Sequence, residues 1–389
     1  MTAPSRMRTL RRPAPLALPA LALAAALALS ACSAGDGTSG AAPDDRLSVV
    51  ATTTQLHDFA ARIGGDDISL TGLLSPGGSA HHFDPSPGDL LALGQADVLI
   101  VNGAGLETFI DSAIEASGFD GEIITASEGL DPELLEHITA EGESADAHES
   151  HDAHADEHAD EHAGGQSGDH SEEPTGDDAH DGHAHDGHDH DGHDHGSINP
   201  HIWTSPRNAE GMVSMIAGDL ARVDPAHADD YTSRGDAYIA QLGELDAWAA
   251  AQFARVPEAD RVMVSGHDSL RYFLHDYGIG FAGAILPSFE DNAEPSAADI
   301  DALVAEIERR GVKAVFVESS MSPKLAQTIA REAGVEVVDA DTLYADSLGA
   351  PGSDGADYLS ATVHNTRVMV EAWGVQPEPL PASLAETAQ

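Results

Sequence analysis

The sequence predicts an α/β protein with two (β/α) lobes, each built on a parallel sheet, joined by one long α-helix. Three observations indicate this fold class. Apolar, β-branched runs alternate with segments of helical spacing in residues 46–127. The same alternation begins again at residue 261 and continues to residue 374. Between the two series lies a helical candidate of about 30 residues, which would be about 45 Å long. Such alternation is typical of parallel sheets with helices on both faces.

The first lobe is predicted to span residues 46–223. Its expected strands occupy residues 46–55, 67–74, 97–103 and 121–127. Its expected helices occupy residues 56–65, 86–96, 106–118 and 205–223. Ser86 and Pro87 open the second of these helices, because serine is a favoured N-cap and proline suits the first turn.

The linking helix is predicted over residues 224–256, and the second lobe over residues 257–389. The expected strands of the second lobe occupy residues 261–266, 279–286, 312–319 and 335–340. Its expected helices occupy residues 267–278, 296–311, 322–334 and 355–374. Ligands of open α/β sheets bind beyond the carboxyl ends of the strands. Two lobes whose strand ends face each other would therefore enclose a cleft.

The first 31 residues have the composition of a secretion signal. Several arginines precede an apolar stretch, which ends in the sequence LSAC at Cys32. This sequence resembles a bacterial lipobox, in which the signal is cleaved before a cysteine that is then lipidated. The alternatives are an ordinary cleaved signal peptide or a retained membrane anchor. We expect residues 1–31 to be a lipoprotein signal peptide and residues 32–45 a flexible tether. The protein would then be a membrane lipoprotein on the extracytoplasmic face.

The chain carries a formal net charge of -49, and residues 131–196 contain no lysine or arginine. Coulomb repulsion therefore disfavours nucleic acid and anionic lipid headgroups as partners. Residues 141–196 have few aliphatic and no aromatic residues, so we expect a disordered loop inside the first lobe. Its histidines are expected to bind several ions weakly. Those of the most regular repeats are His183, His185, His188, His190, His193 and His195.

Three histidines outside this segment follow predicted strands or lie between a strand and a helix. They are His81, His201 and His267. Asp346 follows the last predicted strand and supplies a carboxylate. Side chains at strand ends are the ones that would face the cleft. Three imidazoles and one carboxylate suit four-coordinate Zn²⁺. The alternative is that each histidine merely caps a helix or fills a loop.

Five segments together resemble one known family. They are AHHFDPSPGDLLALGQADVLIVNGAGLE, NPHIWTSPRNA, SGHDSLRYFLHDYGI, GVKAVFVESSMSPKLAQTIAREAGVEVV and LYADSLGAPGSDGADYLSATVHNT. They are similar to the metal-binding receptors of bacterial zinc and manganese ABC importers, the ZnuA/AdcA-like and TroA-type solute-binding proteins. The resemblance covers nearly the whole chain after the tether. It implies two lobes joined by a long rigid helix, with a metal site in the interdomain cleft.

The resemblance also implies the ligands. In the motif H-x-[FY]-x-P the first histidine binds metal, which here is His81 and not His82, and Ala80 replaces the usual proline. The other implied ligands are His201 in NPH, His267 in SGHD and Asp346 in DSL. Manganese members of the family tend to have glutamate at the third position, and zinc members tend to have histidine. The resemblance therefore implies Zn²⁺ as the transported ligand, with Mn²⁺ less favoured, because imidazole suits Zn²⁺ better.

The resemblance implies a monomeric receptor that captures a divalent metal ion and delivers it to an ABC permease. The ATPase would be a separate chain, since no Walker A pattern occurs here. No catalysed reaction is implied. Residues 141–196 would act as a collecting or sensing arm, or as an inert spacer. Histidine ligands must be neutral to bind metal, so uptake should weaken below about pH 6.

Two other functions remain open. A zinc hydrolase would need a general base beside the metal, for which Glu318 is the candidate. The other interpretation of Glu318 is an acid at a strand end that supports a ligand. A surface zinc buffer or adhesin would bind metal through residues 141–196 alone. His82 is interpreted as a loop residue, and Trp203 as packing beneath the His201 loop.

Overall fold

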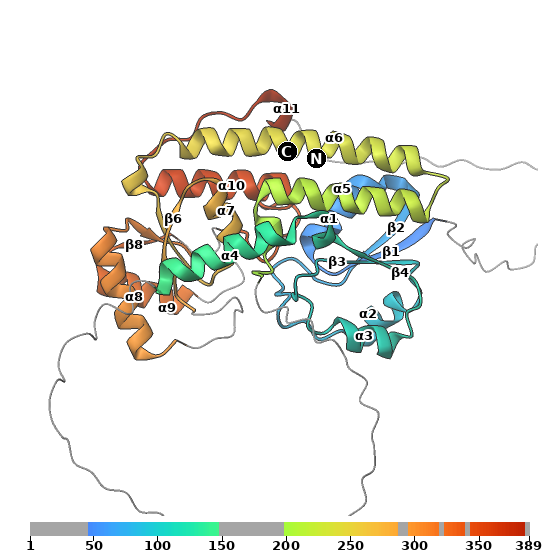
Figure 1. Cartoon of the computed structure of the whole chain (residues 1–389), viewed down its shortest axis with the longest axis horizontal. Helices are drawn as coiled ribbons and strands as arrows, with labels where there is room; N and C mark the ends of the chain where they lie inside the picture. Colours follow the sequence, from blue (N-terminus) through green and yellow to red (C-terminus); the bar gives the residue numbers. More distant parts are fainter. Residues whose placement is uncertain (1–45, 148–197, 287–294, 319–322, 339–342, 386–389) are drawn as a thin grey trace, which may run out of the picture. The chain divides into compact units, whose positions relative to one another are not determined.

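Two four-stranded parallel sheets organise the part of the chain that the structure describes (Figure 1). This computed structural model describes residues 46–147, 198–286, 295–318, 323–338 and 343–385. The first sheet has the strand order β2-β1-β3-β4, and the second has the order β6-β5-β7-β8. Neighbouring strands pair in parallel throughout. The predicted fold class, two α/β lobes with parallel sheets, is confirmed.

Both faces of the first sheet are covered by helices. Its strands are β1 Leu47–Ala51, β2 Ile68–Gly72, β3 Val98–Val101 and β4 Glu122–Thr125. Successive side chains of a strand point to opposite faces. Val49 and Ala51 therefore pack with α1 (Thr54–Gly64) and α5 (Pro206–Val223), whereas Val50 packs on the opposite face. The helices of that opposite face are α2 Pro87–Leu93 and α3 Ile110–Ser117.

The helix ends of the first lobe follow local signals in the sequence. Ser86 caps α2 as predicted: its hydroxyl accepts the backbone N–H of Asp89, and the Asp89 carboxylate accepts the backbone N–H of Ser86. This reciprocal pair satisfies two of the amides that a helix start leaves without intrahelical partners. A short 3₁₀ turn, η1 (Gly65–Asp67), follows α1, and another, η2 (Ala126–Gly129), follows β4.

Helix α4 (Pro132–Ala147) has no counterpart among the predicted elements. The Asp131 carboxylate accepts the backbone N–H two residues further on, which favours a helix start. Leu135 and Ile138 are buried in the main core of the described residues. The helix continues to Ala147, so the predicted loop start at residue 141 is wrong. Glutamate and alanine are good helix formers, and an acidic composition therefore does not stop a helix that begins on a packed turn.

The long helix α6 (Ala228–Phe253) is shorter at both ends than the predicted 224–256. Asp224 instead caps the end of α5, and its carboxylate contacts His227 Nδ1 (2.6 Å) and accepts the Tyr231 hydroxyl (2.9 Å). These contacts make a turn between α5 and α6. α6 packs against α1 and α5 and also against α10 (Tyr358–Ala372). Its 26 residues correspond to a length of about 39 Å.

The second lobe has shorter strands than the sequence predicts. They are β5 Val262–Ser265, β6 Gly280–Ala284, β7 Ala314–Val315 and β8 Glu336–Val337. Beyond β7 the chain makes one more bond to β5, from Phe316 N–H to Val264 O, and Glu318 then forms an isolated bridge with Leu343. The ladder is thus interrupted. The remaining elements are η4 Glu258–Asp260, α7 Arg271–Asp276, α8 Ala297–Arg310, α9 Pro323–Ala333 and α11 Ala382–Ala385.

Several predicted features lie outside the described residues. They are the signal peptide 1–31, the lipidation site Cys32, the tether 32–45 and the six histidines of residues 183–195. Among the described helices, none combines the length and the apolar character that crossing a membrane requires.

Candidate metal centre

The four predicted ligand residues, far apart in sequence, come together at one point. His81, His201, His267 and Asp346 each offer one ligand atom, and these atoms all lie within 4.8 Å of one another. His201 Nε2 lies 2.9 Å from His81 Nε2 and 3.3 Å from His267 Nε2. Asp346 Oδ1 lies 3.2 Å from His267 Nε2 and 3.5 Å from His201 Nε2. We refer to this group as the His₃Asp cluster.

His81 lies in the loop between β2 and α2. Its backbone N–H donates to Ser79 Oγ (3.2 Å), and its side chain is half-buried. Ala80, which stands where the family usually has proline, is buried. His82 is exposed, and its ring centroid lies 6.4 Å from that of His81. The structure therefore directs His81, and not His82, into the cluster.

Asn199 holds His201 in one orientation. The Asn199 side-chain amide donates to Asp268 O (2.7 Å), so its oxygen is the atom that faces His201. This oxygen accepts the His201 backbone N–H (3.1 Å) and the ring Nδ1–H (2.8 Å). With its proton on Nδ1, the fully buried His201 ring directs Nε2 as an acceptor into the cluster. The adjoining carbonyl of Pro200 accepts the side-chain amide of Asn102 (3.0 Å).

His267 follows β5, at the carboxyl end of a strand. The Ser265 hydroxyl and the Ser269 backbone N–H both donate to its carbonyl, at 2.6 and 2.9 Å. This turn explains why α7 begins at Arg271 and not at the predicted residue 267. The ring is fully buried, and its Nδ1 lies 3.8 Å from the carboxylate of Glu318.

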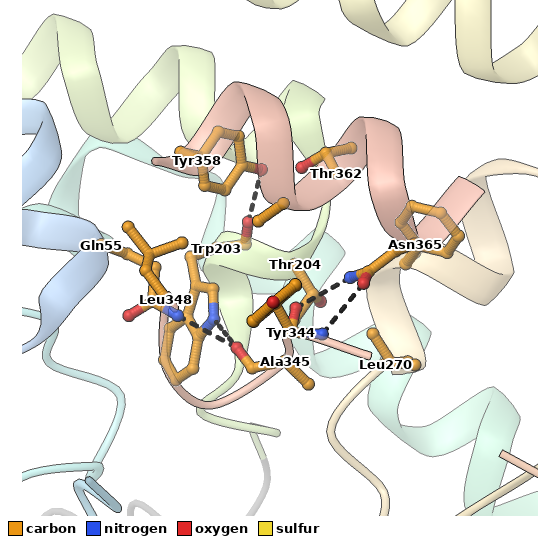
Figure 2. A pocket seen from close by; sticks show the side chains of 12 residues that line it. Gln55, Trp203, Thr204, Leu270, Tyr344, Ala345, Leu348, Tyr358, Thr362 and Asn365 are labelled. Carbon is orange, nitrogen blue, oxygen red and sulfur yellow. Dashed lines mark hydrogen bonds between the residues drawn. The ribbon is translucent and has the colours of Figure 1, made fainter. Parts of the chain in front are cut away.

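Asp346 lies in a second-lobe loop, residues 343–348, which first-lobe residues hold in place. Ala345 O accepts the Gln55 side-chain amide (3.0 Å) and the Trp203 indole N–H (2.8 Å). From the second lobe, Asn365 of α10 makes two hydrogen bonds to the backbone of Tyr344 in the same loop. Figure 2 shows these contacts around a cavity of about 20 Å³, room for about one water. The cavity is too small for a small-molecule ligand.

Trp203 packs beneath the His201 loop, as predicted. Its side chain is buried, and its ring centroid lies 5.3 Å from that of His201. Its carbonyl accepts the Tyr358 hydroxyl (2.6 Å), which ties the loop to α10 (Figure 2). Trp203 therefore joins the His201 loop, the Asp346 loop and α10.

The charges of the cluster are strongly coupled. Burial lowers the pKa of His201 well below 6.5, although the Asp346 carboxylate opposes this. Burial alone would also lower the pKa of His267, but Asp346, followed by Glu318, raises it well above 6.5. Burial alone would raise the pKa of Asp346, but His267 lowers it below 3.8. Without a bound ion, these shifts favour a neutral His201 and an ion pair between His267 and Asp346 near pH 7. A cation bound at this point must displace the His267 Nε2 proton.

Sequence reasoning missed the residues that orient the ligands. Asn199, Gln55 and Asn365 are buried polar residues, and each bonds a ligand or the chain beside one. Only Asn199 carries a local signal, because it stands two residues before a candidate ligand in the NPH motif. Gln55 meets Ala345 across 290 residues of sequence, and no local pattern indicates such a contact.

Comparison with known proteins identifies the family of this chain. The family model described as "Zinc-uptake complex component A periplasmic" (ZnuA) matches residues 49–372. The manganese-binding lipoprotein MntA of Bacillus subtilis is 27% identical over 358 residues, which cover 91% of this chain and 98% of that protein. The zinc-binding protein TroA of Treponema pallidum is 26% identical over 339 residues, covering 86% of this chain and 92% of that protein.

The solved structures show the same fold. The periplasmic zinc-binding protein TroA of Treponema pallidum superposes with a TM-score of 0.64 at 23% identity, covering 84% of this chain and 99% of that chain. Several relatives are named lipoproteins, in agreement with the expected membrane-anchored, extracytoplasmic location. Because the family model matches far more than half of the sequence, this chain belongs to the ZnuA family of metal-binding receptors of ABC importers.

Proposed function

We propose that the protein is an extracytoplasmic lipoprotein that captures Zn²⁺ and delivers it to an ABC permease. The observation that carries this proposal is the convergence of His81, His201, His267 and Asp346 from four separate loops. Two of these loops belong to the first lobe and two to the second. One ion bound by all four side chains would therefore connect the two lobes.

The spacing of the donor atoms fits a four-coordinate ion, and the donor types favour zinc. A tetrahedral ion with bonds of about 2.0–2.1 Å has ligand atoms about 3.4 Å apart. Four of the six separations run from 2.9 to 3.5 Å, and all six lie within 4.8 Å. Three imidazole nitrogens and one carboxylate also match the ligand preference of Zn²⁺, whereas Mn²⁺ is better served by oxygen. The alternative is a manganese receptor of the same family, since relatives such as MntA are named for manganese.

Burial sets the route of capture. Three of the four ligand residues are buried, and only His81 is partly exposed. An incoming ion therefore meets His81 first and is then enclosed by the other three. Release requires one of the buried loops to move. The Asp346 loop is the candidate, because individual side-chain hydrogen bonds from Gln55 and Asn365 hold it, and not a continuous strand ladder.

The segments outside the described residues complete the proposal. Lipidation at Cys32 would anchor the receptor, and residues 32–45 would tether it to the membrane. The histidines of residues 183–195 would bind ions weakly and raise the local concentration of metal. Docking of the loaded receptor on the permease would complete delivery, and the ATPase would be supplied by another chain.

The hydrolase alternative is poorly supported. A general base must lie beside the metal-bound water. Glu318 is fully buried and lies on the Nδ1 side of His267, away from the Nε2 atom that faces the cluster. It is therefore not placed to activate a metal-bound water.

Metal analysis of the purified protein tests the proposal. We expect one tightly bound Zn²⁺ per chain and displacement of Mn²⁺ by Zn²⁺ in a competition experiment. His267→Glu should shift the preference toward Mn²⁺, because it replaces a nitrogen donor by oxygen. If the wild-type protein retains Mn²⁺ in the presence of equal Zn²⁺, the manganese alternative is correct.

A further inference from the structure

Glu318 is a fully buried acid with few partners. It stands just beyond β7 and bridges to Leu343. One carboxylate oxygen, Oε1, accepts the Ser269 hydroxyl (3.0 Å). The other, Oε2, has no hydrogen-bond partner among the described residues. Burying a carboxylate oxygen without a hydrogen bond is costly, so this placement calls for an explanation.

The buried His267 ring, which faces Glu318, also has a nitrogen without a hydrogen-bond partner among the described residues. Its Nε2 faces the cluster, 3.2 Å from Asp346 Oδ1 and 3.3 Å from His201 Nε2. Its Nδ1 faces the opposite way, 3.8 Å from Glu318 Oε1, and makes no hydrogen bond within the described part of the chain. A shift of about 1 Å would bring this pair to an ordinary N–H···O distance. A buried donor and a buried acceptor thus face each other almost within bonding distance.

His201 already has the hydrogen bond behind its ring that His267 and Glu318 lack. Its Nδ1–H donates to Asn199 Oδ1 at 2.8 Å, which leaves Nε2 for the cluster. Both buried histidines therefore have an oxygen behind the ring. The oxygen behind His201 belongs to a neutral amide, and the one behind His267 belongs to a carboxylate. A carboxylate that accepts the distal N–H of a ligand histidine fixes its tautomer and raises its basicity.

We propose that Glu318 is a positioning residue that accepts the Nδ1–H of His267 and so directs Nε2 to the bound ion. This inference rests on the receptor function proposed above. The Glu318 charge also completes a balance: two carboxylates, Asp346 and Glu318, offset the two positive charges of the ion while the three imidazoles stay neutral. The site is buried, and electrostatic interactions are stronger where the dielectric constant is low. Two negative charges there favour a divalent cation over a monovalent one.

Substitution of Glu318 tests the proposal on the full chain. Glu318→Gln keeps the size and one acceptor oxygen but removes the charge, and Glu318→Leu removes both. Loss of such a partner typically weakens metal binding by about 10–100-fold. We expect a loss of Zn²⁺ affinity near the lower figure for Glu318→Gln and near the upper figure for Glu318→Leu, measured by competition with a chelator.

The matched control is Asp246→Asn, which removes a largely buried carboxylate bonded to Arg207 and Tyr277 and not to the cluster. It should leave Zn²⁺ affinity unchanged.

Histidine tautomers provide a readout that needs no variant. In the zinc-loaded wild-type protein labelled with ¹⁵N-histidine, two-bond ¹H–¹⁵N spectra should show His267 protonated at Nδ1 and metal-bound through Nε2. The proposal is overturned if His267 binds through Nδ1. It is also overturned if the folded Glu318→Leu protein binds Zn²⁺ as tightly as the wild type. If the wild-type protein itself does not bind Zn²⁺, the receptor function fails instead, and the two failures are thereby distinguished.

Discussion

The two lobes contribute two ligands each to the His₃Asp cluster but support them differently. In the first lobe, β1 and β2 pair over five residues each, and β3 and β4 over four. In the second lobe, β7 and β8 pair over only two residues, and the Asp346 loop is held mainly by side chains. His81 follows the paired strand β2, and Asn102, which bonds Pro200 O beside His201, directly follows β3. The Asp346 loop instead depends on individual buried hydrogen bonds from helices, such as those of Gln55 and Asn365. Single substitutions of such partners should therefore disturb Asp346 more than the first-lobe ligands.

The largest expected effect comes from removing one ligand from either lobe. Metal-binding free energies of about 10–16 kcal/mol shared by four ligands give about 2.5–4 kcal/mol each, or about 100–1000-fold in affinity. His201→Ala and His267→Ala should each lose this much in Zn²⁺ titrations. His227→Ala is the control, because His227 lies outside the cluster at the start of α6. If one of the two ligand variants still bound as tightly as the control, a single lobe would suffice for binding.

Two asparagines, one supporting a first-lobe ligand loop and the other a second-lobe ligand loop, allow the two kinds of support to be compared directly. Asn365 bonds the backbone of Tyr344 in the Asp346 loop, and Asn102 bonds Pro200 O beside His201. Replacing either by leucine leaves buried backbone groups without partners, at a cost of about 1–3 kcal/mol in folding free energy. Both variants should unfold at lower temperature. We expect Asn365→Leu also to weaken Zn²⁺ binding by about 10-fold, with a clearly smaller loss for Asn102→Leu. Equal losses would mean that the first sheet gives no additional support.

The pH dependence of binding reports on the second-lobe pair. Asp346, opposing the effect of burial, holds the pKa of His267 well above 6.5, whereas burial holds that of His201 well below 6.5. Zn²⁺ must therefore displace about one proton, from His267, near neutral pH. Apparent affinity should rise with pH, by up to about 10-fold per unit, until the pH passes the raised pKa.

The stability of the metal-free fold should change in the opposite direction. The His267–Asp346 pair contributes fully between about pH 3.8 and pH 6.5 and loses its contribution as the pH rises through the raised pKa of His267. Proton release on Zn²⁺ binding is measured directly by calorimetric titration of the protein with Zn²⁺ in two buffers of different ionisation enthalpy. A Zn²⁺ affinity that does not change between about pH 6 and pH 8 would contradict the assignment of the proton to His267.

The smallest effect is expected from deleting residues 148–196, which follow the last residue of α4, Ala147, in the sequence. If the cluster is the high-affinity site, one Zn²⁺ should still bind within about 3-fold of the wild-type affinity, or about 0.7 kcal/mol. The number of weakly bound ions should fall. Loss of the tight site in a folded deletion variant would favour the surface buffer or adhesin.

The sequence alone determined the two series of strands and helices, because β-branched runs and helical spacing are local properties of the chain. It also singled out the four residues of the cluster, since ligand chemistry resides in residue type and the motifs are short. Tertiary structure decided how these side chains are held. Leu135 and Ile138 anchor α4 in a core that local composition does not reveal, and Asp224 caps the end of α5 at the position where the sequence predicts the start of the linking helix. Thr54 and Leu348, 294 residues apart, are joined by a single buried hydrogen bond. Such contacts depend on packing between distant segments, and no local pattern encodes them.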